Sequence, residues 1–157
     1  MRTLLVLVLA GCGGPIEPEI GWRPLMGEEH LTPKKGISFW WCGPCGSYTT
    51  PEEVGKAIDD LYVEWLALDL ERFGGNLSPS ARLSAIQRID IQLVNDWKVS
   101  GNGHDGYTMG IYWPWQHQID IALAGPLRLD PWWGMLSEGL QGLRHEWSHV
   151  LHGAYHP

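Results

Sequence analysis

The segment HEWSH, residues 145–149, constrains the fold of this chain more than any other stretch. It places His145 and His149 four positions apart, and side chains at that spacing on an α-helix project from one face about one turn apart. Both imidazoles can then reach one tetrahedral metal ion, with Glu146 next to the open coordination position. The spacing therefore predicts a helix that presents a metal site.

The residues around this segment recur at helical spacing and predict one helix with a continuous buried stripe. The members of the stripe are Leu136, Leu140, Leu143, Trp147 and Val150. On a helical wheel His145, His149 and His152 lie about 180° from the stripe. Buried core histidines would point with the leucines, so this placement favours a metal site over a solvated, histidine-rich helix end.

A catalytic zinc site needs a third protein ligand, with water in the fourth position. Along a straight helix His152 comes about 4.5 Å beyond His149 and about 10.5 Å beyond His145, so one ion does not reach all three. Gly153 can end the helix in a left-handed conformation and turn the chain back, which makes His156 the predicted third ligand. The upstream alternatives are His30, His104 and His117. We expect His152 to support the ligands from behind or to face the substrate.

These residues resemble the zinc-binding consensus of the zincin metallopeptidases. The pattern HExxHxxHGxxH is similar to that of metzincins and of the compact WLM-type and SprT-type families. In metzincins the glycine and the last histidine follow the second histidine by three and six residues, whereas here they follow it by four and seven. The resemblance implies a zincin-like α+β domain with one zinc ion and peptide-bond hydrolysis, in which Glu146 is the general base. Tyr155 and His152 are candidates for stabilising the oxyanion.

Residues 1–11 resemble a bacterial lipoprotein signal peptide, because one basic residue precedes a short Leu and Val run and small residues lead up to Cys12. The lipobox resemblance of residues 9–12 implies cleavage before Cys12 and acylation of its side chain, which would anchor the protein in the cell envelope. A plain cleaved signal with an incidental Cys12 remains the alternative. Residues 12–35, rich in Gly and Pro, are predicted to be a tether and residues 36–157 the folded domain.

The charge balance excludes a nucleic-acid partner. The full chain has 11 basic and 18 acidic residues, and loss of Arg2 with the signal makes the mature protein still more acidic. No basic stripe is present to neutralise phosphates. The 10 tryptophans are expected to serve mainly as core, with sugar stacking as the alternative. The candidates for sugar stacking are Trp113, Trp115, Trp132 and Trp133.

The middle of the chain predicts the scaffold of a mixed α+β domain with a small mixed sheet, a long helix and the C-terminal metal-binding helix. Thr50 before Pro51 is typical of a capped helix start, and the helix is expected to end at Gly74. Alternating apolar residues predict strands at 89–93, 107–113 and 118–122. In zincins an edge strand above the metal helix pairs with an extended substrate, and residues 118–122 are the candidate for it.

The segment WCGPC, residues 41–45, resembles the active-site sequence of thioredoxins. A reactive cysteine of that kind sits at a helix N-terminus, which lowers its pKa. Here a polar stretch separates Cys45 from the helix that Thr50 caps, and no preceding strand and helix of a thioredoxin are evident. We therefore favour a structural disulfide between Cys42 and Cys45 in an oxidising compartment, with redox activity or metal binding by the pair as alternatives.

Overall fold

The structure is a computed structural model that describes residues 24–45, 47–96, 99, 110–130 and 132–153. Its centre is a five-stranded sheet with the order β1-β2-β3-β5-β4. The strands are β1 (Glu28–Leu31), β2 (Ser38–Trp41), β3 (Asp90–Val94), β4 (Gly110–Trp113) and β5 (Gln118–Ala122). The three inner strands run parallel, whereas β1 and β4 pair antiparallel at the two edges.

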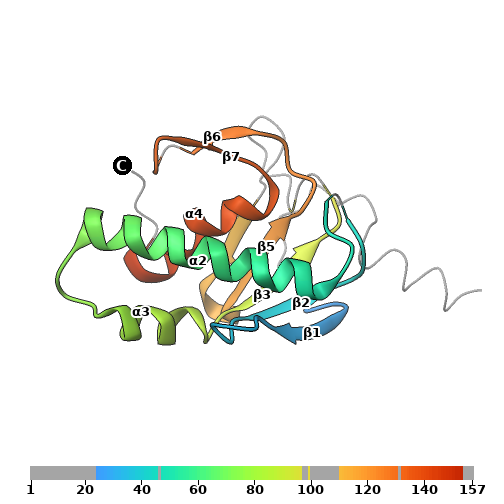
Figure 1. Ribbon diagram of the computed structural model, residues 1–157, viewed down its shortest axis with the longest axis horizontal. Coiled ribbons are helices and arrows are strands. Elements are labelled where there is room, and N and C mark those ends of the chain that lie inside the picture. The colour runs from blue at the N-terminus through green and yellow to red at the C-terminus, as the bar shows by residue number, and fades with distance from the viewer. Residues whose placement is uncertain (1–23, 46, 97–98, 100–109, 131, 154–157) are drawn as a thin grey trace, which may run out of the picture.

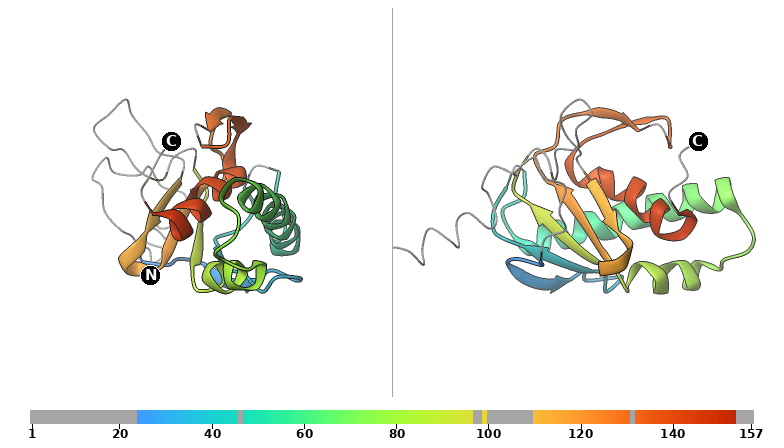
Figure 2. Two further views of the ribbon diagram at one scale, coloured as in Figure 1. Left: turned by 90° about the vertical axis from the view of Figure 1, so that its left-hand side faces the viewer. Right: turned by 180° about the vertical axis from the view of Figure 1, so that it is seen from behind.

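The described residues form three α-helices, all of which contribute to one core beside the sheet. They are α2 (Pro51–Phe73), α3 (Pro79–Ile86) and α4 (Leu143–His152). Figures 1 and 2 show α2 and α4 lying together over one face of the sheet, with a small hairpin above α4. The hairpin consists of β6 (Arg128–Asp130) and β7 (Met135–Ser137). Two 3-10 turns are also present: η1 (Pro114–Gln116) precedes β5, and η2 (Gly139–Gly142) precedes α4. The predicted α+β class is thereby confirmed.

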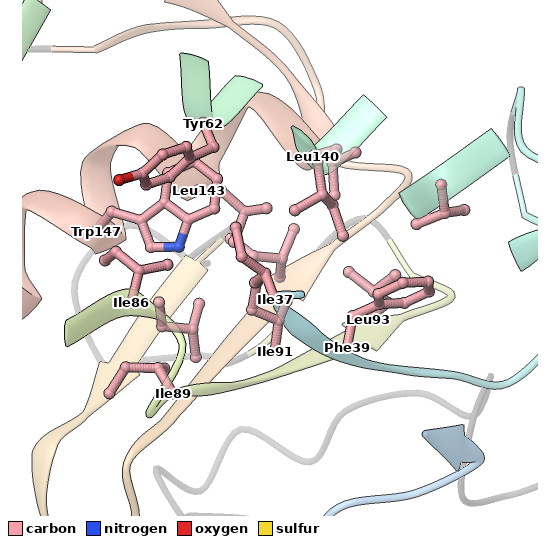
Figure 3. Packing of buried hydrophobic residues seen from close by; sticks show 14 of the residues in the cluster. Ile37, Phe39, Tyr62, Ile86, Ile89, Ile91, Leu93, Leu140, Leu143 and Trp147 are labelled. Atoms are coloured by element: carbon pink, nitrogen blue, oxygen red, sulfur yellow. The ribbon is translucent and has the colours of Figure 1, made fainter. Parts of the chain in front are cut away.

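The core forms where the apolar sides of β2, β3 and β5 meet the helices (Figure 3). Ile91 and Leu93 of β3 are fully buried and face α2 and α4, as the alternating pattern predicts. The contact between the two helices is aromatic. The ring of Trp147 lies 5.9 Å from that of Tyr62 and 5.7 Å from that of Trp65, in tilted or edge-to-face arrangements that aromatic pairs prefer.

The helix α2 begins as the sequence predicts. The Thr50 hydroxyl accepts the backbone N–H of Glu53, and the Glu53 side chain accepts the backbone N–H of Thr50, which is a capping box. Its far end contains a feature that the apolar pattern does not predict. Asp69 is fully buried and pairs with the equally buried Arg82 of α3 at 2.8 Å. Arg82 also donates to the carbonyl of Gly74 at 3.0 Å, so the pair fixes the turn between the two helices.

Two predicted boundaries and one predicted strand position were wrong. The sheet starts with β1, inside the stretch 12–35 assigned to the tether. The strand 118–122 exists, but as β5 it is an inner strand, and the edge strand is β4. The last helix begins only at Leu143, because Leu136 belongs to β7, where it pairs with Leu129 and is 59% exposed. Residues 107–109 of the third predicted strand lie outside the described residues.

We expect Tyr62→Phe to be neutral or slightly stabilising at pH 7. The Tyr62 hydroxyl is buried and has no hydrogen-bond partner among the described residues, so its removal leaves nothing unsatisfied. Burial raises the pKa of Tyr62 from its ordinary 10.0 to about 12. The unfolded chain therefore ionises first as the pH rises, and wild-type stability falls between these two values, a loss that the Phe variant lacks.

Urea unfolding of both proteins at pH 7 and pH 11 measures this difference. A clear loss of stability in Tyr62→Phe at pH 7 would contradict the expectation.

Candidate metal site

The candidate metal site lies on α4, whose sides face three different neighbours. Leu143 and Trp147 are fully buried in the core, as the apolar stripe predicts. Glu146 points to the side of the edge strand β4. His145 and His149 lie on the half-buried side that faces the hairpin, and the short helix thus presents both imidazoles away from the leucines.

The two predicted ligands converge on one point. The Nε2 atoms of His145 and His149 are 3.0 Å apart. Two nitrogens bound to one zinc ion at about 2.0–2.1 Å in tetrahedral geometry lie about 3.3 Å from each other. The observed separation is close to that edge of a tetrahedron, so little rearrangement is needed for both rings to bind one ion.

The other ring nitrogens determine the tautomers. His145 Nδ1 lies 3.3 Å from Oδ1 of Asp130, and His149 Nδ1 lies 2.8 Å from the carbonyl oxygen of Gly153. Burial tends to raise the pKa of Asp130, but the hydrogen bond and charge of His145 and two backbone N–H groups hold it below its ordinary value. Both acceptors are thus proton-free oxygens, and both Nδ1 atoms must carry hydrogen.

A consequence follows for the Nε2 pair. In neutral rings with hydrogen on Nδ1, both Nε2 atoms present lone pairs. Two lone pairs that face each other at 3.0 Å repel, so a cation between them would stabilise this arrangement. Such a cation is either a proton on one ring or a metal ion held by both. Histidine ligands of metal ions usually donate the second ring N–H to a carboxylate or a backbone carbonyl, and these two do the same.

The hairpin supports this arrangement through one turn. Asp130 accepts the backbone N–H groups of Trp132 and Trp133 at 2.8 and 3.1 Å with the same oxygen that faces His145. The buried Trp132 ring stands at nearly right angles to both histidine rings, with centroids 5.5 and 5.2 Å away. Sequence reasoning missed the role of Asp130, because the contact joins segments fifteen residues apart.

Glu146 is buried between α4 and β4, where it is 6% exposed. Burial raises the pKa of Glu146 to about 7, while the charge of His145 and the backbone N–H of Tyr112 act to lower it. A Cβ atom at Gly110 would lie 2.8 Å from Oε1 of Glu146, so the carboxylate fits against β4 only because that residue is glycine. A carboxyl group with a pKa near neutrality can take up and release a proton at working pH.

The remaining predicted ligands are placed elsewhere. Among the described residues no group of three or more His, Cys, Asp or Glu side chains is positioned to hold a metal ion. His30 stacks on Phe39 with ring centroids 5.4 Å apart, and His117 ends the turn η1. His156, Tyr155 and His104 lie outside the described residues, so the prediction of His156 as third ligand stays a prediction.

The side chain of His152 points towards α2 and not towards the pair of predicted ligands. Its Nε2 lies 2.8 Å from Oδ1 of Asp69, and its ring stacks on Phe73 with centroids 3.8 Å apart. Position 152 lies about two turns beyond His145 along α4, where α2 and not the hairpin is the neighbour of its side chain.

The predicted disulfide between Cys42 and Cys45 is not formed, because Cys45 is a free thiol. Two backbone hydrogen bonds join Cys45 to Tyr48 in a tight turn, so the helix α2 begins well after the cysteines. Burial, followed by the charge of Asp96, raises the pKa of the Cys45 thiol. Cys12 lies outside the described residues.

No protein-family model, curated protein or solved structure matches this chain. No helix formed by the described residues combines the length and the apolar composition needed to cross a bilayer.

We expect Gly110→Ala to displace Glu146 and to destabilise the protein by about 1–3 kcal/mol, the usual cost of overpacking. The added methyl group would also meet Cδ1 of Ile121 at 2.9 Å, so it has no free space to enter. Gly75→Ala is the matched control, since a Cβ atom there meets nothing within 4 Å. Thermal unfolding of both variants measures the effect, and equal stability of the two would contradict it.

Proposed function

We propose that this protein is a zinc-dependent hydrolase of peptide bonds. The observation that carries the proposal is the pair of Nε2 atoms 3.0 Å apart, with both Nδ1 atoms committed to oxygen acceptors. Nitrogen ligands in near-tetrahedral placement suit zinc, and the HExxH segment supplies them together with a carboxylate.

In this proposal His145 and His149 hold the ion, and His156 is the third ligand that the zincin resemblance implies. When bound, zinc would lower the pKa of a coordinated water and polarise a carbonyl group. The residues of the chain hold the two imidazole rings in place and shield them from solvent. Asp130 and the Gly153 carbonyl fix the ring orientations, and Trp132 covers the ligands on the hairpin side.

Glu146 is proposed as the general base. Its buried carboxylate has a pKa of about 7 as the chain stands, and the backbone N–H of Tyr112 orients it. A base with a pKa near the working pH can accept a proton from the attacking water and return it to the leaving amine. Tyr155 remains the candidate for stabilising the oxyanion.

The proposed substrate is a peptide or protein in extended conformation. The strand β4 lies at the edge of the sheet next to α4, and within the described part of the chain its outer edge has no strand partner. Exposed strand edges bind extended peptides by main-chain hydrogen bonds. In this proposal β4, and not the inner strand at residues 118–122, pairs with the substrate.

The proposed location is the cell envelope. It rests on the lipoprotein-like residues 1–12, from which acylated Cys12 would anchor the protein to the membrane. The acidic composition continues to disfavour nucleic acid as a partner.

Two alternatives are weighed against this proposal. A non-catalytic envelope lipoprotein that binds zinc or another transition metal would use the same two histidines. A thiol-disulfide oxidoreductase is less well supported, because Cys42 and Cys45 are not joined and α2 begins only at Pro51, so no helix N-terminus lies directly at the cysteines to lower the pKa of a thiol.

We expect the purified protein to contain about one zinc ion per chain, and His145→Ala or His149→Ala to abolish this binding. Glu146→Gln is expected to keep the metal and to lose hydrolysis of a quenched fluorescent peptide mixture by about 10²–10⁴-fold, the usual contribution of a general base. Glu71→Gln, an exposed position on α2, is the control.

Elemental analysis and the peptide assay separate the candidates. Zinc bound by wild type with no Glu146-dependent hydrolysis would favour the non-catalytic alternative, and a folded protein that takes up no zinc would refute the metal site.

We expect Asp130→Ala to weaken zinc binding by about 10–100-fold, as is usual when the carboxylate behind a histidine ligand is removed. Asp130→Asn keeps an oxygen that can accept the His145 N–H, so its affinity is expected to stay closer to that of wild type. Competition with a chelating dye measures both affinities. Equal weakening by the two substitutions would show that the charge, and not the position of the acceptor, matters.

A further inference from the structure

The C-terminal end of α4 is fixed by a buried carboxylate of another helix. Asp69 of α2 binds two partners with its two oxygens, Nε of Arg82 at 2.8 Å and Nε2 of His152 at 2.8 Å. The side chains of Asp69 and Arg82 are 0% and 1% exposed, and that of His152 is 17% exposed. A contact so well shielded from water is little screened and holds its members in place.

The aromatic ring of Phe73 completes this anchor. It stacks on the His152 imidazole with an interplanar angle of 19°, one helical turn beyond Asp69 on α2. His152 is therefore held both at its ring nitrogen and across its ring face. The last turn of a short helix tends to fray, and these contacts oppose that tendency.

The anchored residue directly precedes the acceptor of a proposed ligand. Gly153 follows His152 and ends α4, with φ 76° and its N–H donated to the carbonyl of His149 at 2.9 Å. Its own carbonyl oxygen accepts Nδ1–H of His149 at 2.8 Å. The place of that oxygen therefore depends on where His152 is held.

We propose that Asp69 and His152 are positioning residues for His149, acting through the carbonyl group of Gly153. The inference rests on the proposed metal site, in which His149 presents Nε2 to the ion. The two ligands then have separate supports: the hairpin turn of Asp130 orients His145, and the α2–α3 junction orients His149. Neither support is evident from the HExxH spacing.

The test uses the full-length protein and three variants. His152→Leu removes the donor to Asp69, whereas His152→Gln keeps an N–H donor at a similar distance from the backbone. Thr50→Ala is the control for a general loss of stability, because it removes the N-cap at the end of α2 far from Asp69 and does not touch α4. Zinc affinity is measured by competition with a chelating dye.

We expect His152→Leu to weaken zinc binding by about tenfold or more, the lower end of the range for groups that orient metal ligands. His152→Gln is expected to recover most of this affinity, and Thr50→Ala to bind zinc as wild type does while unfolding at a lower temperature. Wild-type affinity in His152→Leu would overturn the inference.

A second measurement does not require metal. Long-range proton–nitrogen NMR spectra of the histidine side chains report which ring nitrogen carries hydrogen. Without metal, we expect His149 to carry hydrogen on Nδ1 in wild type and in His152→Gln, and to lose this preference in His152→Leu. If His149 in His152→Leu still carries hydrogen on Nδ1 as in wild type, the inference is overturned. If wild type binds no zinc, the proposed function is overturned, and this NMR measurement alone then decides whether His152 positions His149.

Discussion

The packing of Trp147 against Tyr62 and Trp65 determines the orientation of α4, and the site depends on that orientation. Trp147 is fully buried, and Nε1 of Trp65 donates to the hydroxyl of the next residue, Ser148, at 3.1 Å. With this side of a ten-residue helix turned inward, the 100° step between residues fixes where every other side chain points. Hence Glu146 meets β4 and His145 meets the hairpin.

The site combines rigid and adjustable surroundings. The sheet and α2 form a well-packed core, in which a displaced side chain is costly. The hairpin β6–β7, in contrast, exposes Leu129 and Leu136 to solvent on one face and uses the other to place Asp130 beside His145. One proposed ligand is therefore supported from the interior of the protein and the other from a small surface element.

Local rules predicted much of this molecule. The cap of α2 at Thr50, the alternating strand β3 and the shared face of His145 and His149 all depend on residues close in sequence. Long-range contacts were not predictable in this way. Leu136 has the spacing of a helix residue, but pairing with Leu129 places it in a hairpin. The disulfide prediction failed because a C-x-x-C spacing permits a bridge without requiring one.

The turn at Asp130 also couples two processes that are separate in the sequence. One oxygen of Asp130 accepts hydrogen bonds from the backbone of the hairpin and from the His145 ring. The conformation of the hairpin and the orientation of His145 therefore depend on the same acceptor. Thermodynamic linkage is reciprocal. In the proposed zinc protein, metal binding would therefore stabilise the hairpin. A molecule that binds the hairpin would change the zinc affinity by the same free energy by which zinc changes the affinity for that molecule.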